Sequence, residues 1–191
     1  MKDVIIKAFD ESVQTKRAFL KHNLDTLVAA IDAIAEAFLR GNKLVIFGNG
    51  GSAADAQHIA AEFVNRFRID RPPLPALALT TDTSTITSIA NDFDYKEIFS
   101  KQVKALGKEG DIALAISTSG NAANVLAAID VCKKLKIGVI GLTGGDGGKM
   151  AHKVDFLLSA TEGKNTARIQ ETHILVGHVI CEMVDLRLFA A

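Results

Sequence analysis

Short apolar segments, most of them followed by a polar loop and a helical pattern, constrain the fold of this chain more than any other feature. The segments at 43–47, 112–116 and 137–142 read KLVIF, IALAI and IGVIGL. Strands that are apolar on both faces are typical of parallel sheets covered by helices on both sides. With shorter segments at 76–79 and 154–158, the sequence predicts an α/β protein, an αβα sandwich around a five-stranded parallel sheet.

Helical periodicity occupies both ends of the chain. Apolar residues recur at three- and four-residue steps over 3–40, which predicts one long amphipathic helix or a kinked pair, ended by Gly41 and Asn42. A final helix is predicted over 166–188. Further helices are expected from the first glycine loop to about Arg66 and over 85–90, 95–106 and 123–135. No linker or repeat interrupts this order, so we expect one domain over 1–191, with a helical segment 1–40 and an α/β core 41–191.

Charge and composition exclude several classes of protein. Lys+Arg and Asp+Glu are both 22, so no basic excess exists for binding nucleic acid. No apolar stretch reaches the roughly 18–20 residues that span a bilayer, and the N-terminus lacks the basic start and apolar run of a signal peptide. We therefore expect a cytoplasmic protein without membrane contact, with Cys132 and Cys181 as buried thiols.

The final helix has no wide polar face. Such a helix must be buried nearly all round, and a chain of 191 residues rarely achieves this alone. Together with the long N-terminal helix, this pattern predicts a homo-oligomer with helices at its centre.

Two loops after predicted strands have a similar composition, Gly48-Asn49-Gly50-Gly51-Ser52 and Ser117-Thr118-Ser119-Gly120-Asn121. In open parallel sheets, ligands bind at the carboxyl ends of the strands, where these loops lie. Glycines let backbone N–H groups approach a phosphate, helix N-termini favour anions, and the hydroxyls add neutral donors. The alternative is that the glycines serve only turns and the serines only cap helices. The run 144–148, GGDGG, is expected to be a turn.

His58 and Glu62 stand four residues apart on the helix after the first loop, so both side chains lie on one face. The pair could hold a divalent metal or act as a base with its orienting partner. A solvated ion pair is the alternative. The start of this helix at the glycine loop favours the functional interpretation.

The final helix carries further polar candidates, Gln170 and His178. His178 lies in the most apolar stretch, where an ionisable side chain needs a partner. The eight-residue separation of Gln170 and His178 is about 12 Å along a helix, too far to share one ion from a single straight helix. A shared site would need a neighbouring subunit or a distorted helix start. His22, His152 and His173 are expected at the surface or in local hydrogen bonds.

Five segments resemble the sugar-isomerase (SIS) domain family, and within it the isomerases of sedoheptulose 7-phosphate. They are GNGGSAADAQHIAAEF, NDFDYKEIF, ISTSGN, LTGGDGGKMA and ARIQETHILVGH. The resemblance covers nearly the whole chain and implies a flavodoxin-like sandwich and a homotetramer with active sites between subunits. It implies conversion of D-sedoheptulose 7-phosphate to D-glycero-D-manno-heptose 7-phosphate through an enediol, toward ADP-heptose for lipopolysaccharide core.

The resemblance also implies site residues. One zinc ion, or another divalent metal, per subunit would be held by His58, Glu62, Gln170 and His178. The implied substrate-binding residues are Asn49, Gly50, Gly51, Ser52, Glu62, Asn91, Asp92, Ser117, Thr118, Ser119 and Gln170.

We assign Glu62 to proton transfer at carbon and His178 to proton transfer between the substrate oxygens. Two departures from the family pattern stand out: Ala122 replaces a serine that helps hold phosphate, and Ala167 replaces an aspartate. Neither removes a proposed acid, base or ligand.

The rival function is a non-catalytic relative that binds the replication initiator DnaA. The segments ESVQTKRAF and DLRLF resemble that branch. Its members tend to lose the acid and histidine that correspond to Glu62 and His178, which this chain keeps. A sugar-phosphate sensor or another SIS isomerase is a further alternative.

Overall fold

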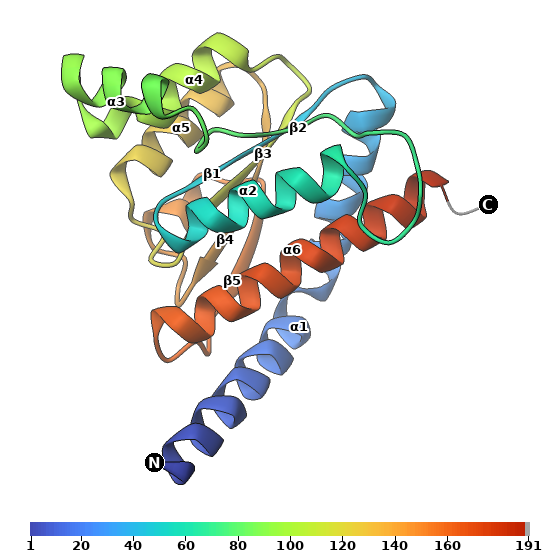
Figure 1. Cartoon of the computed structure of the whole chain (residues 1–191), viewed down its shortest axis with the longest axis vertical. Coiled ribbons are helices and arrows are strands. Elements are labelled where there is room, and N and C mark those ends of the chain that lie inside the picture. The colour runs from blue at the N-terminus through green and yellow to red at the C-terminus, as the bar shows by residue number, and fades with distance from the viewer. Residues whose placement is uncertain (190–191) are drawn as a thin grey trace.

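A five-stranded, fully parallel sheet forms the centre of the computed structural model, which describes residues 1–189 (Figure 1). The strand order is β2-β1-β3-β4-β5. Strands are therefore added in one direction from β1 to β2 and in the opposite direction from β3 to β5, and the switch point lies between β1 and β3. This is the order of flavodoxin-like folds, and it confirms the predicted fold class. The strands are β1 (Leu44–Gly48), β2 (Ala76–Ala78), β3 (Ile112–Ser117), β4 (Gly138–Gly144) and β5 (Phe156–Ala160).

Helices cover both faces of the sheet. The first face carries α1 (Lys2–Leu39), α2 (Gly51–Val64) and α6 (Thr166–Phe189); the second carries α4 (Ile98–Leu106) and α5 (Ala123–Lys134), with α3 (Thr83–Asp92) beside them (Figure 1). Short 3₁₀ helices, η1 (Tyr95–Glu97) and η2 (Gly148–His152), follow α3 and β4.

Side chains of the central strands β1 and β3 alternate between two hydrophobic cores. In β1, Leu44 and Ile46 belong to the core under α1, α2 and α6, whereas Val45 and Phe47 belong to the core under α4 and α5. All five residues of β1 are buried. The uninterrupted apolar runs of the sequence therefore reflect burial on both faces of the sheet.

Several predicted boundaries were wrong by two or more residues. The sequence places Asn91 and Asp92 between helices, but both lie in the last turn of α3, whose start at Thr83 is fixed by the Asp82 side chain accepting from the Thr85 amide. The last strand begins two residues later than predicted, because Asp155 uses its side chain to accept from the Val139 amide at 2.8 Å.

The terminal helices pack against each other. α1 is one helix, and its first half extends beyond the sheet (Figure 1). α6 lies between α1 and α2. Its buried residues include Val176, Ile180 and Val184, while Leu175 and Leu186 remain exposed. One chain thus covers much of α6 but not the whole helix.

Both cysteines are buried free thiols, as predicted, and burial raises the pKa of the Cys132 thiol to about 12. Within residues 1–189, no helix has the length and hydropathy required to cross a membrane.

His173 is completely buried on α6. Its Nε2 donates to the Thr143 carbonyl at 2.8 Å, while Nδ1 is buried without a hydrogen-bond partner among the described residues. Burial lowers its pKa from 6.5 to about 4, although the Thr143 bond offsets part of this effect. His22 and His152 are exposed, as expected, whereas His173 differs from the expectation: it lies in the core and bonds to a residue distant in sequence.

The buried neutral His173 should make stability depend on pH. Its pKa is lower in the folded state, so the unfolded chain binds more protons, and stability falls as pH drops from 6.5 toward 4. We expect the free energy of unfolding to fall by about 2 kcal/mol from this group between pH 7.5 and 5.0. Urea unfolding of the wild type and His173→Gln at both pH values measures this loss. An equally steep fall in the variant would contradict the assignment.

Candidate active site

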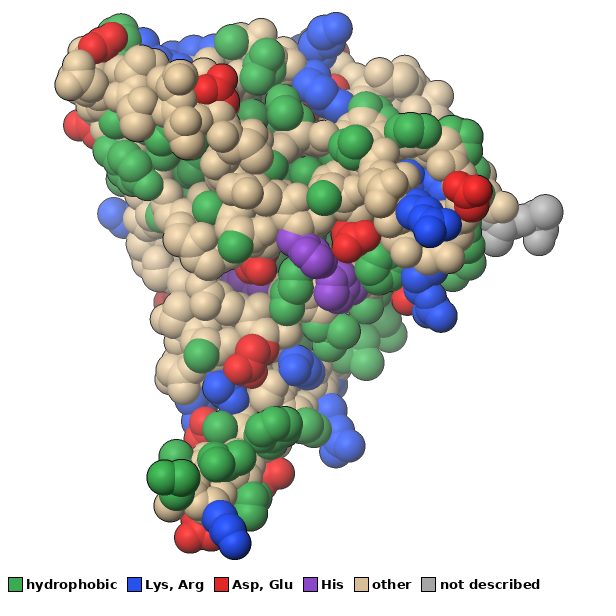
Figure 2. Space-filling view, in the orientation of Figure 1, with side chains coloured by type: hydrophobic (Ala, Val, Ile, Leu, Met, Phe, Trp, Pro, Cys, Tyr) green, Lys and Arg blue, Asp and Glu red, His purple; other side chains and the backbone are tan. Residues whose placement is uncertain are grey.

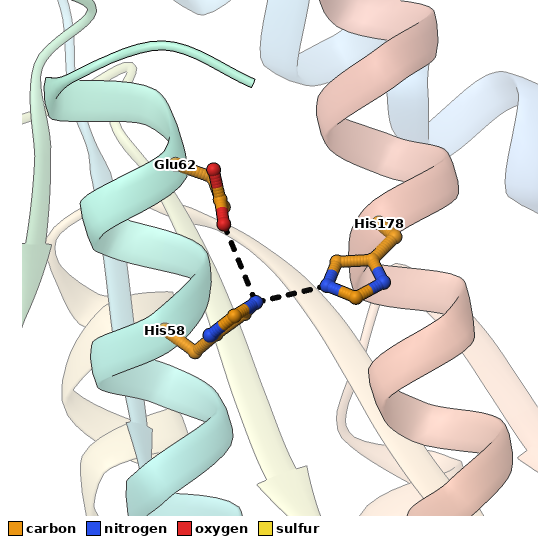
Figure 3. Close-up of side chains that lie close together, drawn as sticks. All are labelled: His58, Glu62 and His178. Carbon is orange, nitrogen blue, oxygen red and sulfur yellow. Dashed lines mark hydrogen bonds and ion pairs between the residues drawn. The ribbon is translucent and has the colours of Figure 1, made fainter. Parts of the chain in front are cut away.

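Three predicted site residues meet where α2 and α6 face each other. His58 and Glu62 project from one face of α2 toward His178 on α6 (Figure 3). The Nε2 atoms of the two histidines are 2.9 Å apart, and His58 Nε2 is 3.4 Å from Glu62 Oε1. Figure 2 shows histidine side chains grouped near the middle of this face. One chain therefore brings the proposed base and the proposed acid–base histidine together.

The chemistry of this cluster fits a divalent metal. The ligand atoms of His58, Glu62 and His178 all lie within 4.8 Å of one another. Two imidazole nitrogens and a carboxylate oxygen are a common ligand set of catalytic zinc sites, which keep a further position for water or substrate. Without an ion, a hydrogen bond between the two Nε2 atoms requires one neutral imidazole to accept from the other.

An aromatic ring covers one side of the cluster, and the other side is accessible to solvent. The Phe67 ring stacks on His178 with centroids 5.4 Å apart. The side chain of His58 is 47% exposed and that of Glu62 24%. The cluster is therefore open to a ligand from the His58 side and shielded behind His178.

Close packing of α2 along α6 sets this geometry. Gly177 lies against Ile59, where an added Cβ would come within 2.6 Å of Ile59 Cδ1. Gly51 lies against Gln170, where an added Cβ would come within 2.5 Å of Gln170 Nε2. Residue numbers increase along both helices in the same direction between the contacts 51–170 and 59–177. The two helices therefore run parallel and pack closely.

Gln170 therefore lies beside the glycine loop at the start of α2. α6 is continuous from Thr166, without the distortion that was one condition for Gln170 and His178 to share an ion. Gln170 contacts the loop in which substrate binding is predicted. Its role as a metal ligand stays a prediction.

The two predicted phosphate loops are neighbours at the carboxyl edge of the sheet, because β1 pairs directly with β3. The amides of Asn49 and Asn124 hydrogen-bond each other reciprocally, at 2.9 and 2.8 Å. Gly50, the residue before α2, has φ 56°, a conformation that favours glycine. The loops and the N-termini of α2 and α5 thus converge where an anion is favoured.

The remaining loop residues differ in exposure. Ser52 and Ser117 are buried, Thr118 is half-buried, and Ser119 is exposed. Ser119 accepts from the Asn121 side chain through its carbonyl at 2.8 Å. Thr118 and Ser119 are the hydroxyls that remain accessible to a ligand.

The glycine run 144–148 forms the predicted turn, and it also supports the second phosphate loop. The Met150 amide donates to the Gly120 carbonyl at 3.0 Å. An added Cβ at Gly120 would overlap the Gly147 carbonyl oxygen. Any side chain at 120 would push these loops apart.

Asn91 and Asp92 lie apart from the cluster. Both are exposed at the end of α3, and the Asn91 amide donates to Asp92 Oδ1 at 2.9 Å. α3 has no buried residue and projects from the body at one corner (Figure 1). Their predicted contact with substrate stays a prediction.

Three residues near the site were missed by sequence reasoning. Asn124 is buried and holds Asn49, and the Tyr95 hydroxyl donates to Asn49 Oδ1 at 3.2 Å. Asp55 lies one turn before His58; burial raises the pKa of its carboxyl, and the charge of His58 offsets part of that effect. A buried asparagine in an apolar helix and the chain's single tyrosine were the only signals in the sequence.

The two residues that depart from the family pattern, Ala122 and Ala167, lie at the starts of helices. Ala122 is the N-cap of α5 and offers no side-chain cap, and Ala167 is exposed in the first turn of α6. A serine at 122 would supply the missing cap.

Known proteins resemble this chain over its length. The SIS domain family model matches residues 9–144. The phosphoheptose isomerase of Thermodesulfovibrio yellowstonii (strain ATCC 51303 / DSM 11347 / YP87) is 52% identical over 99% of this chain and 94% of its own.

Solved structures agree. The phosphoheptose isomerase of Neisseria gonorrhoeae superposes with a TM-score of 0.91 at 43% identity, covering 96% of this chain and 98% of its own. That of Francisella tularensis gives 0.92 at 39% identity, covering 96% and 97%. The family match, the full-length similarity and the shared fold agree with one another, and this chain belongs to the SIS domain family.

Proposed function

We propose that this chain is a phosphoheptose isomerase, which converts D-sedoheptulose 7-phosphate to D-glycero-D-manno-heptose 7-phosphate. The convergence of Glu62 and His178 beside His58 carries the proposal. Full-length relatives with this activity in their names support it. The DnaA-binding alternative is disfavoured, because both groups that such relatives tend to lose are present and close together.

The length of α2 suits the substrate. Gly51 begins the helix at the phosphate loop, and His58 follows seven residues later, about 10 Å along the axis. This separation is comparable to the length of an extended seven-carbon sugar phosphate. Thr118, Ser119 and the helix N-termini would hold the phosphate, leaving C1 and C2 at the His58–Glu62–His178 cluster.

The reaction needs two proton transfers. Glu62 takes a proton from C1, which leaves a cis-enediol, and returns a proton to C2. His178 moves a proton between the oxygens on C1 and C2, so no proton is gained or lost overall. Triosephosphate isomerase, which also interconverts an aldose and a ketose phosphate, divides the work between a glutamate base and a histidine in the same way.

We further propose that His58, Glu62 and His178, with Gln170 as a fourth ligand, hold one zinc ion or another divalent metal. The ligand set found in the structure supports this. When bound, such an ion would polarise the substrate oxygens and stabilise negative charge that develops on them.

Exposed apolar residues of α1 favour an oligomer. The first two thirds of α1 expose apolar side chains, with Phe9 72%, Val13 46%, Leu20 53% and Leu24 51% exposed. Figure 2 shows hydrophobic side chains at the lower end of the molecule, where α1 begins. Contiguous apolar surfaces of this kind are typical of protein interfaces. We propose a homotetramer in which α1 helices meet and exposed Asn91 and Asp92 complete sites between subunits. A cytoplasmic location and a role in lipopolysaccharide synthesis stay predictions from the sequence.

Removing the base should abolish turnover without abolishing binding. Glu62→Gln keeps the size of the side chain but cannot accept the C1 proton, so kcat should fall by about 10²–10⁴. NMR follows the products, and calorimetry follows substrate binding. Glu182→Gln, an acidic neighbour on α6, is the matched control. Wild-type activity in Glu62→Gln would refute the proposed base.

Zinc binding should depend on the clustered histidines. His58→Asn and His178→Gln should each weaken zinc affinity at least tenfold, because each removes one of the proposed ligands. Calorimetry with chelator-treated protein measures the affinity, and exposed His22→Asn is the control. Unchanged affinity in both site variants would exclude this metal site.

Charge on the apolar surface of α1 should break the assembly. Leu20→Asp places a carboxylate at a proposed interface, which is costly to bury. Light scattering after size exclusion should then give a smaller species than the wild type. Lys21→Asp, a charge change beside it, should leave the mass unchanged. A monomeric wild type would contradict the proposal.

A further inference from the structure

Arg71 forms a buried ion pair that sequence reasoning did not single out. It lies in the connection between α2 and β2, and its Nε donates to Asp185 Oδ1 on α6 at 2.9 Å. The two side chains are only 1% and 4% exposed. A charge pair buried this deeply connects two elements in a defined geometry.

The guanidinium also binds the carboxyl end of α2. Nη2 donates to the carbonyl of Glu62 at 3.0 Å, and Nη1 donates to that of Phe63 at 2.7 Å. The last four carbonyls of a helix lack partners within it, and a cation is favoured at that end. Arg71 therefore fixes the main chain of the residue that carries the proposed base.

Asp185 fixes the other side of the site. It follows His178 by seven residues, about two turns, on the same face of α6. Through the Arg71 guanidinium, the helix that carries His178 is thus joined to the backbone of Glu62. Other contacts of Arg71, to the carbonyls of Asn65 at 3.3 Å and Pro72 at 3.2 Å, hold the guanidinium in place.

We propose that Arg71 and Asp185 are positioning residues that set the separation of Glu62 and His178 for proton transfer. The inference rests on the proposed function, because the pair acts through these two residues. A lysine cannot replace Arg71, because its single ammonium cannot span Asp185 and the two helix carbonyls in one plane. Displacement of a reacting group by about 1 Å can cost about 10²-fold in rate.

The test is kinetic. Arg71→Lys and Asp185→Asn, assayed well below their own melting temperatures, should lower kcat by about 10–100-fold. KM should change less than threefold, because neither residue lies at the phosphate loops. Zinc affinity, measured without turnover, should fall about tenfold as the three ligands separate.

The matched control is Arg68→Gln. Arg68 pairs with Glu182, which also lies on α6, but this pair is exposed and does not hold the Glu62 backbone. Its kcat should stay within twofold of wild type. A comparable loss in this variant would show that any ion pair at α6 matters, and would overturn the specific role of Arg71.

The remaining outcomes separate this inference from the proposed function. Folded variants with lower melting temperatures but unchanged kcat and zinc affinity would show that the Arg71–Asp185 pair contributes to stability alone, which would overturn the inference. If Arg71→Lys fails to fold, Asp185→Asn, which keeps the size of the side chain, carries the test; failure of both to fold would also overturn positioning. Wild-type activity in Glu62→Gln would instead refute the proposed base, whatever the Arg71 variants do.

Discussion

The close parallel packing of α2 on α6 is the constraint on which the candidate site depends. Two glycines allow it, since Gly177 and Gly51 each leave space that a Cβ would fill at less than 3 Å from the neighbouring side chain. Glycine in a helix costs roughly 1 kcal/mol relative to alanine, so Gly177 lowers the intrinsic stability of α6. In return, the helices approach closely enough for the His58 and His178 nitrogens to lie 2.9 Å apart.

Phosphate recognition in this proposal uses neutral groups. Hydroxyls, amides and helix N-termini converge at the edge of β1 and β3, and the reciprocal Asn49–Asn124 bonds keep the two loops in register. The donors are fixed before a ligand arrives, so binding costs little ordering of the loops. Selectivity for the phosphate group then depends on the geometry of the loops. The close contact of Gly120 with Gly147 maintains this geometry, because any side chain at 120 would separate the loops.

The sequence predicts those features that depend on local pattern. Apolar runs predict the strands, and the four-residue spacing predicts that His58 and Glu62 share a face. The approach of His178 requires the tertiary packing of two helices, and sequence reasoning reached it through family resemblance. Asn124 was missed because one asparagine in an apolar helix does not reveal its partner. Asn91 and Asp92 were misplaced because α3 continues two residues past its last apolar residue, Ala90, where the apolar pattern no longer marks the helix.

Arg71 shows why some residues of a site escape prediction. It lies in an irregular segment before two prolines, and its partner is 114 residues away. A buried ion pair adds little to stability compared with apolar packing of similar volume, because desolvation offsets the attraction. The guanidinium of Arg71 is strongly directional, because its five N–H donors lie in one plane and allow only a narrow range of partner positions. Here those partners are the end of one active-site helix and the side of the other, so the pair acts on geometry more than on stability.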